Sequence, residues 1–322
     1  MAIDFSIFEK QQFTWRKAWA EVALAIGRAD KRAVYMQADL GRCYDWQRCL
    51  EEFPDRVFNT GISEQNGITS CAGMATMGKI PFFSTFAPFA TFRALEQIRV
   101  DCAYPGLPVR IVGSDQGLTL TSLGSTHLGL DDLAAILAVP EVIVISPSDP
   151  IVLGRLTEKL MDEQKPAYIR IGGGKEAKRI YSAEKDFEIG KAEVLRNGSD
   201  AAVITHGPIT SNVIEACNIL EAEGIGITLL DMSTIRPIDK DAVIKAVKKT
   251  GLVFTVEEHT VSGALGSQVG VIMAESGLGK LVRIGLPDTF ISEVSSYDIM
   301  LKDYGLDAEG IAKSIRKGIK EK

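Results

Sequence analysis

The chain has 322 residues, of which 46% are hydrophobic, a length and composition that suit two domains with a core each. Its formal net charge is −6 and its 36 basic residues are scattered, so a nucleic-acid-binding surface is not expected. The N-terminal residues lack the pattern of a secretory signal and no run approaches about 18 apolar residues, which predicts a cytoplasmic protein without a membrane segment.

The first half of the chain alternates helical and strand-like patterns. Residues 13–30 carry apolar side chains at helical spacing and predict an amphipathic helix. Short apolar runs of the kind that fill strands buried on both faces lie at residues 33–40, 57–63, 80–86, 109–117 and 142–149. Helices are expected after residue 64, at residues 90–104 and from about residue 131. This alternation predicts a doubly wound parallel α/β sheet.

The second half repeats the alternation on a smaller scale. Residues 181–198 are polar and charged and predict a linker and a hairpin, which places a domain boundary near residue 186. Strands are expected at residues 201–207, 227–237, 252–259 and 281–288, with helices at 209–223, 239–249 and 265–276. The chain is therefore expected to hold two α/β domains, residues 1–185 and the smaller residues 186–322.

Two carboxylates follow predicted strands at the edge where open α/β sheets bind ligands. Glu64 comes at a strand-to-helix junction, and three phenylalanines, Phe86, Phe89 and Phe92, follow at three-residue spacing. A carboxyl group near such rings suggests a flat heteroaromatic ligand with a ring nitrogen. The alternative is that Glu64 lies at the start of a helix as a cap and that the rings form a core stripe. Asp39 ends the first predicted strand and equally suits a ligand site or a turn cap.

The motifs together resemble the C-terminal half of transketolase. GISEQN, a glycine- and alanine-rich helix, STFAPFATFRALEQIR, GSTH and VISPSDP occur in this order. The chain is most similar to the smaller subunit of two-chain transketolases, over nearly all of its length. The resemblance implies a pyrimidine-binding domain followed by a transketolase C-terminal domain. It also implies that Glu64 contacts N1′ of the aminopyrimidine of thiamine diphosphate and that Phe86, Phe89 and Phe92 stack on that ring.

The same resemblance assigns substrate-binding residues. His127, in GSTH, matches a histidine that contacts substrate oxygens, although a lone loop histidine is more often a surface residue. Arg16 and Arg170 match arginines that grip a sugar phosphate, a task that suits the guanidinium fork. Their alternatives are a solvated helix start and a strand end.

Three positions depart from the family pattern. Leu123 stands where the family has an aspartate that contacts a sugar hydroxyl, Asp115 where it has a histidine, and Cys43 where it has a serine. Substitutions in the substrate pocket with the cofactor residues kept suggest the same chemistry on a different sugar. Replacing a hydrogen-bonding aspartate by leucine leaves a substrate hydroxyl unpaired, which costs about 1–3 kcal/mol.

Half of a thiamine site is missing from the chain. The family holds the diphosphate and its metal with a GDG motif, which this sequence lacks. Five cysteines without CxxC spacing and only three histidines likewise predict no metal site here. The resemblance therefore implies a partner, an N-terminal transketolase-like subunit with a GDG motif that holds most of the diphosphate and Mg²⁺ or Ca²⁺. An α2β2 heterotetramer is expected.

The function that these observations favour is transfer of a two-carbon ketol unit from a ketose to an aldose. The alternatives are the β subunit of a 2-oxoacid dehydrogenase E1 component, a 1-deoxyxylulose-5-phosphate synthase-like enzyme, and a non-catalytic assembly module. Glu64 and the phenylalanines argue against the last of these. His206 and His259 of the second domain are expected to be structural.

Overall fold

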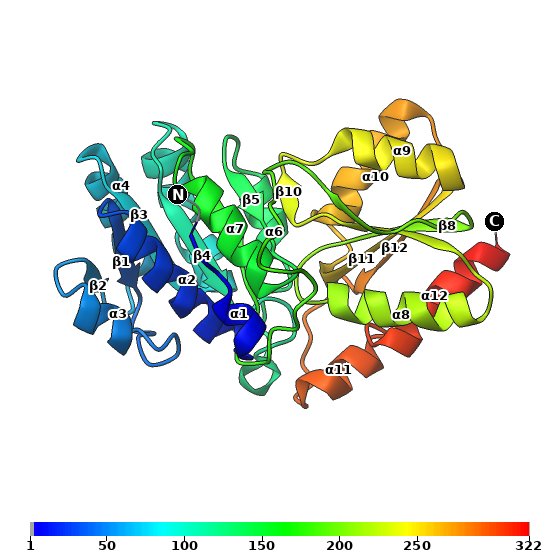
Figure 1. Cartoon of the computed structure of the whole chain (residues 1–322), viewed down its shortest axis with the longest axis horizontal. Helices are drawn as coiled ribbons and strands as arrows, with labels where there is room; N and C mark the ends of the chain where they lie inside the picture. The colour runs from blue at the N-terminus through cyan, green and yellow to red at the C-terminus, as the bar shows by residue number, and fades with distance from the viewer. Residues whose placement is uncertain (1–2, 322) are drawn as a thin grey trace.

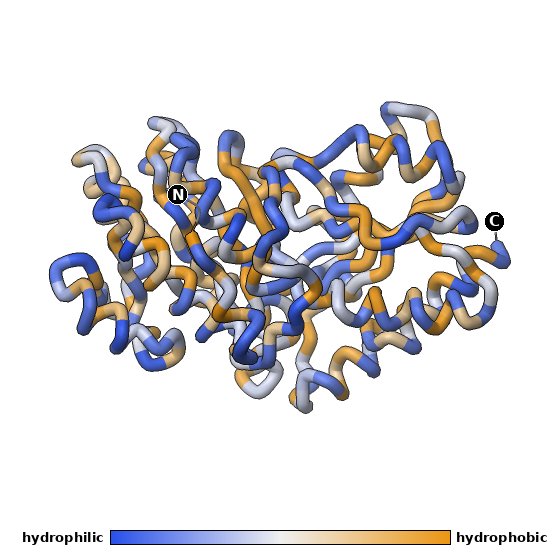
Figure 2. Tube along the Cα trace, viewed as in Figure 1, coloured by the Kyte–Doolittle hydropathy of each residue, from blue (hydrophilic) through white to orange (hydrophobic). Residues whose placement is uncertain are grey.

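Two twisted sheets, one in each half of the chain, are covered by helices on both faces (Figure 1). The structure is a computed structural model and describes residues 3–321. The larger sheet has seven strands in the order β10-β5-β6-β4-β3-β1-β2, and the smaller has five in the order β12-β11-β8-β9-β7. Apolar residues gather along the central strands, and hydrophilic residues cover the outer turns and helix faces (Figure 2). The predicted pair of α/β domains is confirmed.

The six first-domain strands of the larger sheet run parallel, as the doubly wound prediction requires. They are β1 (Ala33–Gln37), β2 (Val57–Asn59), β3 (Ile80–Phe86), β4 (Arg110–Ser114), β5 (Ile143–Ile145) and β6 (Ala167–Arg170). At their carboxyl ends Phe86 pairs with Ser114, and Gly113 pairs with Arg170. Side chains from β3, β4 and β6 therefore meet at one edge of the sheet.

Two apolar clusters cover the faces of this sheet. One packs α2 and α7 on it, and the other packs α4, α6 and the turns after β3. The helices of this half are α1 (Ile7–Lys10), α2 (Trp15–Ala29), α3 (Gln47–Glu52), α4 (Glu64–Thr76), α5 (Leu95–Gln97), α6 (Asp132–Leu137) and α7 (Pro150–Leu160). The single helix expected at residues 90–104 is wrong in detail. It consists of α5 between two π-helical turns, η1 (Phe89–Arg93) and η2 (Ile98–Ala103).

The second domain is a smaller parallel sheet with one antiparallel edge strand, β7, against β9. Its strands are β7 (Glu193–Arg196), β8 (Ala201–Thr205), β9 (Ile227–Asp231), β11 (Leu252–Thr260) and β12 (Lys280–Leu286). Its helices are α8 (Thr210–Ala222), α9 (Lys240–Thr250), α10 (Leu265–Ser276), α11 (Tyr297–Asp303) and α12 (Ala308–Lys320). Within the described residues, no helix has both the length and the apolar character that a membrane span needs.

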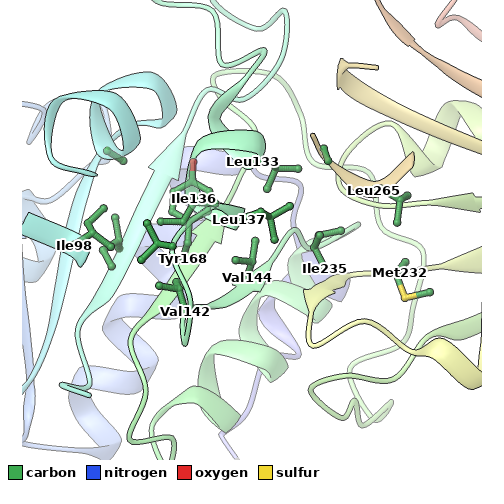
Figure 3. Packing of buried hydrophobic residues seen from close by; sticks show 14 of the residues in the cluster. Ile98, Leu133, Ile136, Leu137, Val142, Val144, Tyr168, Met232, Ile235 and Leu265 are labelled. Carbon is green, nitrogen blue, oxygen red and sulfur yellow. The ribbon is translucent and has the colours of Figure 1, made fainter. Parts of the chain in front are cut away.

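One strand crosses from the second domain into the first. The single strand expected at residues 227–237 is wrong, because it divides into β9 and β10 (Thr234–Arg236). β10 pairs antiparallel with β5 and extends the first sheet. Ile235 of this strand joins a cluster that runs from Ile98 and Tyr168 to Leu265 (Figure 3). The two domains therefore share one continuous core.

Candidate active site

Glu64 lies buried at the first turn of α4, only 4% exposed. Its carboxyl does not serve as a helix cap. Instead, Oε1 accepts hydrogen bonds from Arg93 Nη1 at 3.0 Å and, more weakly, from Thr85 Oγ1 at 3.4 Å. Both hydrogen bonds that described residues make to this carboxyl go to Oε1. Oε2 is therefore the oxygen left for a ligand.

Three rings gather at the carboxyl end of β3, next to this carboxyl. Phe86 ends β3, Phe89 begins the turn that follows, and His127 comes from a loop after β4. The His127 ring centroid lies 5.0 Å from that of Phe89 and 6.1 Å from that of Phe86, both edge to face. Because His127 Nδ1 lies 2.9 Å from Thr126 Oγ1, Nε2 is the ring nitrogen left for a substrate oxygen.

Arg93 is a site residue that the sequence reasoning missed. Its guanidinium lies over the Phe89 ring at 3.7 Å while it also pairs with Glu64. The π-helical turn η1 places residue 93 back over residue 89, because i→i+5 bonding widens the turn. The sequence did contain a signal for this role, namely an arginine four residues after Phe89 in an otherwise apolar stretch. Phe92 is placed apart from the other rings, 54% exposed, so its expected stacking role is not supported within this chain.

Arg16 and Asp115 form an ion pair with each other. Arg16 Nε and Nη2 donate to the two Asp115 oxygens at 2.9 and 2.5 Å, and the Asp115 side chain is fully buried. Ser114 Oγ donates a further hydrogen bond to Asp115 at 2.7 Å. Arg16 therefore neutralises the negative charge that Asp115 places where the family has a histidine. The Arg16 side chain keeps 17% exposure and lies 5.6 Å from the Phe86 ring, at the rim of the site.

Two family models match the chain, one over each domain. The transketolase pyrimidine binding domain matches residues 11–174, and the transketolase C-terminal domain matches residues 190–311. The chain belongs to the transketolase family.

Relatives that match nearly the whole length support this assignment. The chain is 38% identical to a Methanocaldococcus jannaschii protein named as a transketolase C-terminal section, over 95% of this chain and 96% of that one. It is 34% identical to the 6-deoxy-6-sulfo-D-fructose transketolase subunit SqwH of Clostridium sp. strain MSTE9, over 93% and 92%. It is 33% identical to an apulose-4-phosphate transketolase subunit of Phocaeicola vulgatus, over 95% and 97%.

A solved structure described as a split gene transketolase in an inactive β4 tetramer has the same fold. The TM-score is 0.88 at 34% identity, with 96% of this chain and 99% of that chain covered. The chain thus has the domains of a transketolase-like, thiamine diphosphate-dependent transferase.

The transketolase-type site fits the aminopyrimidine half of thiamine diphosphate. A buried carboxylate with one free oxygen lies beside Phe86 and Phe89, which suits a flat ring whose nitrogen shares a proton with that oxygen. When bound, the cofactor supplies an acidic carbon that becomes a nucleophile toward a ketose carbonyl. The chain's own task is to orient this ring and hold a proton at its nitrogen.

Arg170 is a core residue, which corrects its expected role in gripping phosphate. It is fully buried and pairs with the equally buried Asp132 at 2.8 Å. Its other donors reach Gln116 Oε1 at 2.8 Å, Gly129 O at 2.9 Å and Glu258 O at 3.1 Å. Burial alone would raise the pKa of Asp132, but the Arg170 guanidinium lowers it overall. The pair lies within the first domain, and the hydrogen bond from Arg170 to Glu258 O adds a contact to the second domain. No guanidinium edge is left for a substrate.

Asp39 and Leu123 are both exposed, in different environments. Asp39 follows β1, where it exchanges hydrogen bonds with Asn59 at 3.0 and 3.1 Å beside a cleft of about 980 Å³. Leu123 is 50% exposed in a short 3-10 turn of the loop that carries His127. Within the described residues, neither Asp39 nor Leu123 forms a hydrogen bond to Glu64. The cofactor-binding role of Asp39 and the substrate-binding role of Leu123 therefore stay predictions.

The second-domain histidines, His206 and His259, are buried. His206 Nδ1 contacts Ser146 Oγ at 2.9 Å, and His259 Nδ1 contacts Thr260 O at 2.8 Å. Burial lowers the pKa of both imidazoles. The start of α10, which could have bound an anion, is filled by Glu257, which accepts from the backbone N–H groups of Leu265 and Gly266.

Proposed function

We propose that this chain and an N-terminal companion form a two-chain transketolase that moves a two-carbon ketol unit from an unusual ketose to an aldose. The observation that carries the proposal is Glu64, a buried carboxylate with Oε2 free beside the Phe86, Phe89 and His127 rings. A carboxylate left incomplete in a buried position costs stability unless a ligand completes it. The ligand that fits is the aminopyrimidine ring.

Each residue has a distinct task in this proposal. Glu64 Oε2 shares a proton with N1′ of the ring, since the neutral ring nitrogen carries none of its own, while Arg93 holds Oε1 and so fixes the plane of the carboxyl group. Phe86 and the face of Phe89 that Arg93 leaves open pack on the ring. His127 donates from Nε2 to an oxygen of the ketose next to the carbon that reacts.

The companion completes the site from outside. Apolar side chains that flank Glu64 and Phe89 in sequence are exposed, with Ile62 at 74% and Phe92 at 54%, which suits burial against another chain. The proposed companion carries a GDG motif and holds the diphosphate with Mg²⁺ or Ca²⁺, and the proposed assembly is α2β2. The inactive β4 tetramer named for the structural relative supports the need for a second type of chain.

The donor is proposed to be a ketose other than xylulose 5-phosphate. With Asp115 neutralised by Arg16, the pocket does not repel an anionic sugar, but Leu123 offers no hydrogen bond to a hydroxyl. Two relatives are named as transketolase subunits for 6-deoxy-6-sulfo-D-fructose and apulose 4-phosphate, which are unusual sugars, and this supports an unusual donor here. An anionic ketose that lacks or inverts the hydroxyl facing Leu123 is the class that these observations favour.

Reconstitution tests the proposal. The purified chain, its companion and both together are assayed with a panel of ketose phosphates and sulfonates, with pyruvate plus glyceraldehyde 3-phosphate and branched 2-oxoacids as further arms. Ketol transfer should require both chains. Turnover by this chain alone would contradict the shared site, and turnover confined to pyruvate or 2-oxoacids would replace ketol transfer by one of the alternative activities.

A further inference from the structure

The loop that carries His127 is built into the core of the second domain. Three leucines that flank His127, Leu118, Leu128 and Leu130, are buried in the same apolar cluster as second-domain residues of β8, β9, β11, α8 and α12. All three are less than 9% exposed, the largest fraction being 7% for Leu130. Both ends of the loop are therefore fixed from the C-terminal side of the chain, although the loop belongs to the first domain in sequence.

Hydrogen bonds from the second domain fix the ends of this loop. Glu258 Oε1 accepts from the backbone N–H of Leu118 at 2.6 Å, and the Thr260 N–H donates to Leu130 O at 2.8 Å. Gly117 has φ +61°, and a Cβ there would lie 2.2 Å from Glu258 Oε1, so only glycine permits this approach.

Two hydroxyls fix the middle of the loop. Thr121 Oγ1 donates to Ser295 O at 2.5 Å, and Ser125 Oγ donates to Ile291 O. Residues 287–296, which lie between β12 and α11 and have no regular structure, thus run along the loop that carries Leu123 and His127. Ile291 is 1% exposed and anchors this segment in the cluster of the three leucines.

We propose that the C-terminal domain is a positioning element of the active site, in which residues 291–295 hold Thr121 and Ser125 so that His127 faces the Phe86 and Phe89 rings. The consequence for the reaction rests on the proposed function, but the positioning itself rests on the contacts above. The His127 imidazole contacts the first-domain rings of Phe86 and Phe89. The leucines on either side of His127 in sequence pack instead in the core of the second domain. Loosening this support moves His127 relative to the bound ketose and leaves the Glu64 side of the cofactor site unchanged.

The test uses the assembled two-chain enzyme and the double variant Thr121→Val with Ser125→Ala. Hydrogen exchange at residues 119–127 should become about tenfold faster while α4, which carries Glu64, keeps its protection. The KM for the donor ketose should rise roughly fivefold or more with thiamine diphosphate affinity within about twofold of wild type. Thr121→Ser, which keeps the hydroxyl, should restore wild-type behaviour at that position.

Measuring the double variant with and without His127 distinguishes a loss of His127 positioning from a general loss of stability. In a His127→Ala background the double variant should cost less than about twofold in kcat/KM, because its effect passes through the missing imidazole. The matched control is Ser148→Ala, which removes another buried hydrogen bond between the domains, to Asp231, away from this loop. It should leave exchange at residues 119–127 and the donor KM unchanged.

Unchanged exchange at residues 119–127, equal kinetic losses with and without His127, or the same effects from Ser148→Ala would overturn the positioning role. If no ketose is turned over by the wild-type pair, the proposed function fails. The exchange measurement still decides the positioning of the loop in that case, since it needs no activity.

Discussion

Two ion pairs of this chain each contain a buried carboxylate, but they differ in how many of the carboxylate's oxygens are engaged. Asp132 and Arg170 are both fully buried, and their polar atoms are engaged by Tyr168, Gln116, Gly129 and Glu258. Glu64 is almost as buried, but its partner Arg93 is 46% exposed and only one carboxylate oxygen is engaged. A completed buried pair organises a fold, whereas an incomplete one is a place for a ligand.

The comparison also explains why substrate roles differ between the arginines. The resemblance predicts that Arg170 and Arg16 share a sugar phosphate, yet Arg170 pairs with Asp132 in the core and Arg16 is held by Asp115 at the rim. Of these two, Arg16 alone keeps partial exposure. Arg16, once released from Asp115, is therefore the arginine placed to bind an anionic substrate at this rim.

The largest expected effect comes from breaking the complete pair. Asp132→Ala leaves Arg170 as an uncompensated buried cation and should lower the free energy of unfolding by about 3–5 kcal/mol. Glu64→Gln, which keeps the shape of the side chain, should change it by less than about 1 kcal/mol. Urea denaturation of both variants compares the two midpoints. Equal destabilisation by the two changes would remove the distinction between a structural pair and a ligand site.

The next effect concerns the pH dependence of stability. Burial raises the pKa of Glu258 to about 7, from an ordinary value of 4.5, so the folded state binds its proton more tightly than the unfolded state. Glu258 therefore destabilises the fold fully above pH about 7, and this penalty disappears as the pH falls toward 4.5. Glu258→Gln should raise the melting temperature more at pH 8 than at pH 5. A uniform shift at both pH values would contradict the assignment of the titration to Glu258.

A smaller effect is expected when the rim pair is opened. Asp115→Asn removes the negative partner of the Arg16 fork, so KM for an anionic ketose should fall several-fold relative to KM for the same sugar without its anionic group. Glu223→Gln, which weakens an exposed pair with Arg316 in the second domain, is the control and should leave that ratio unchanged. If the ratio is the same in all three enzymes, Arg16 does not contact the anionic end of the donor.

Much of the fold followed from local patterns, and its exceptions have physical reasons. The parallel strands are apolar runs buried on both faces, which periodicity detects well. The division of residues 227–237 was missed because the run is largely apolar, and only Asp231 and Ser233, which bond to each other at 2.8 Å, mark the break. β10 then pairs with β5, a contact between distant segments that no local pattern encodes.

The candidate site was predictable in its centre and less so in its surroundings. Glu64 was singled out because its motif, GISEQN, resembles that of transketolases, whereas the carboxylate and the rings alone left a helix cap and a core stripe as the alternative. Arg93 was missed because its approach to Phe89 depends on a π-helical turn. The burial of Arg170 was missed because its partner Asp132 lies 38 residues away in sequence. Side-chain pairing across the sheet decides such roles, and residue type alone does not.

The most direct test of the account is exchange of the cofactor's acidic carbon-bound proton in the two-chain enzyme carrying Glu64→Gln. Glutamine keeps the volume and the contact to Arg93 but cannot accept a proton, so the variant should bind thiamine diphosphate while exchange slows by roughly two orders of magnitude or more. Glu9→Gln, at an exposed acid of α1, serves as the control and should exchange at the wild-type rate. Exchange within a few-fold of wild type in Glu64→Gln would contradict the central claim that this buried carboxylate activates the cofactor.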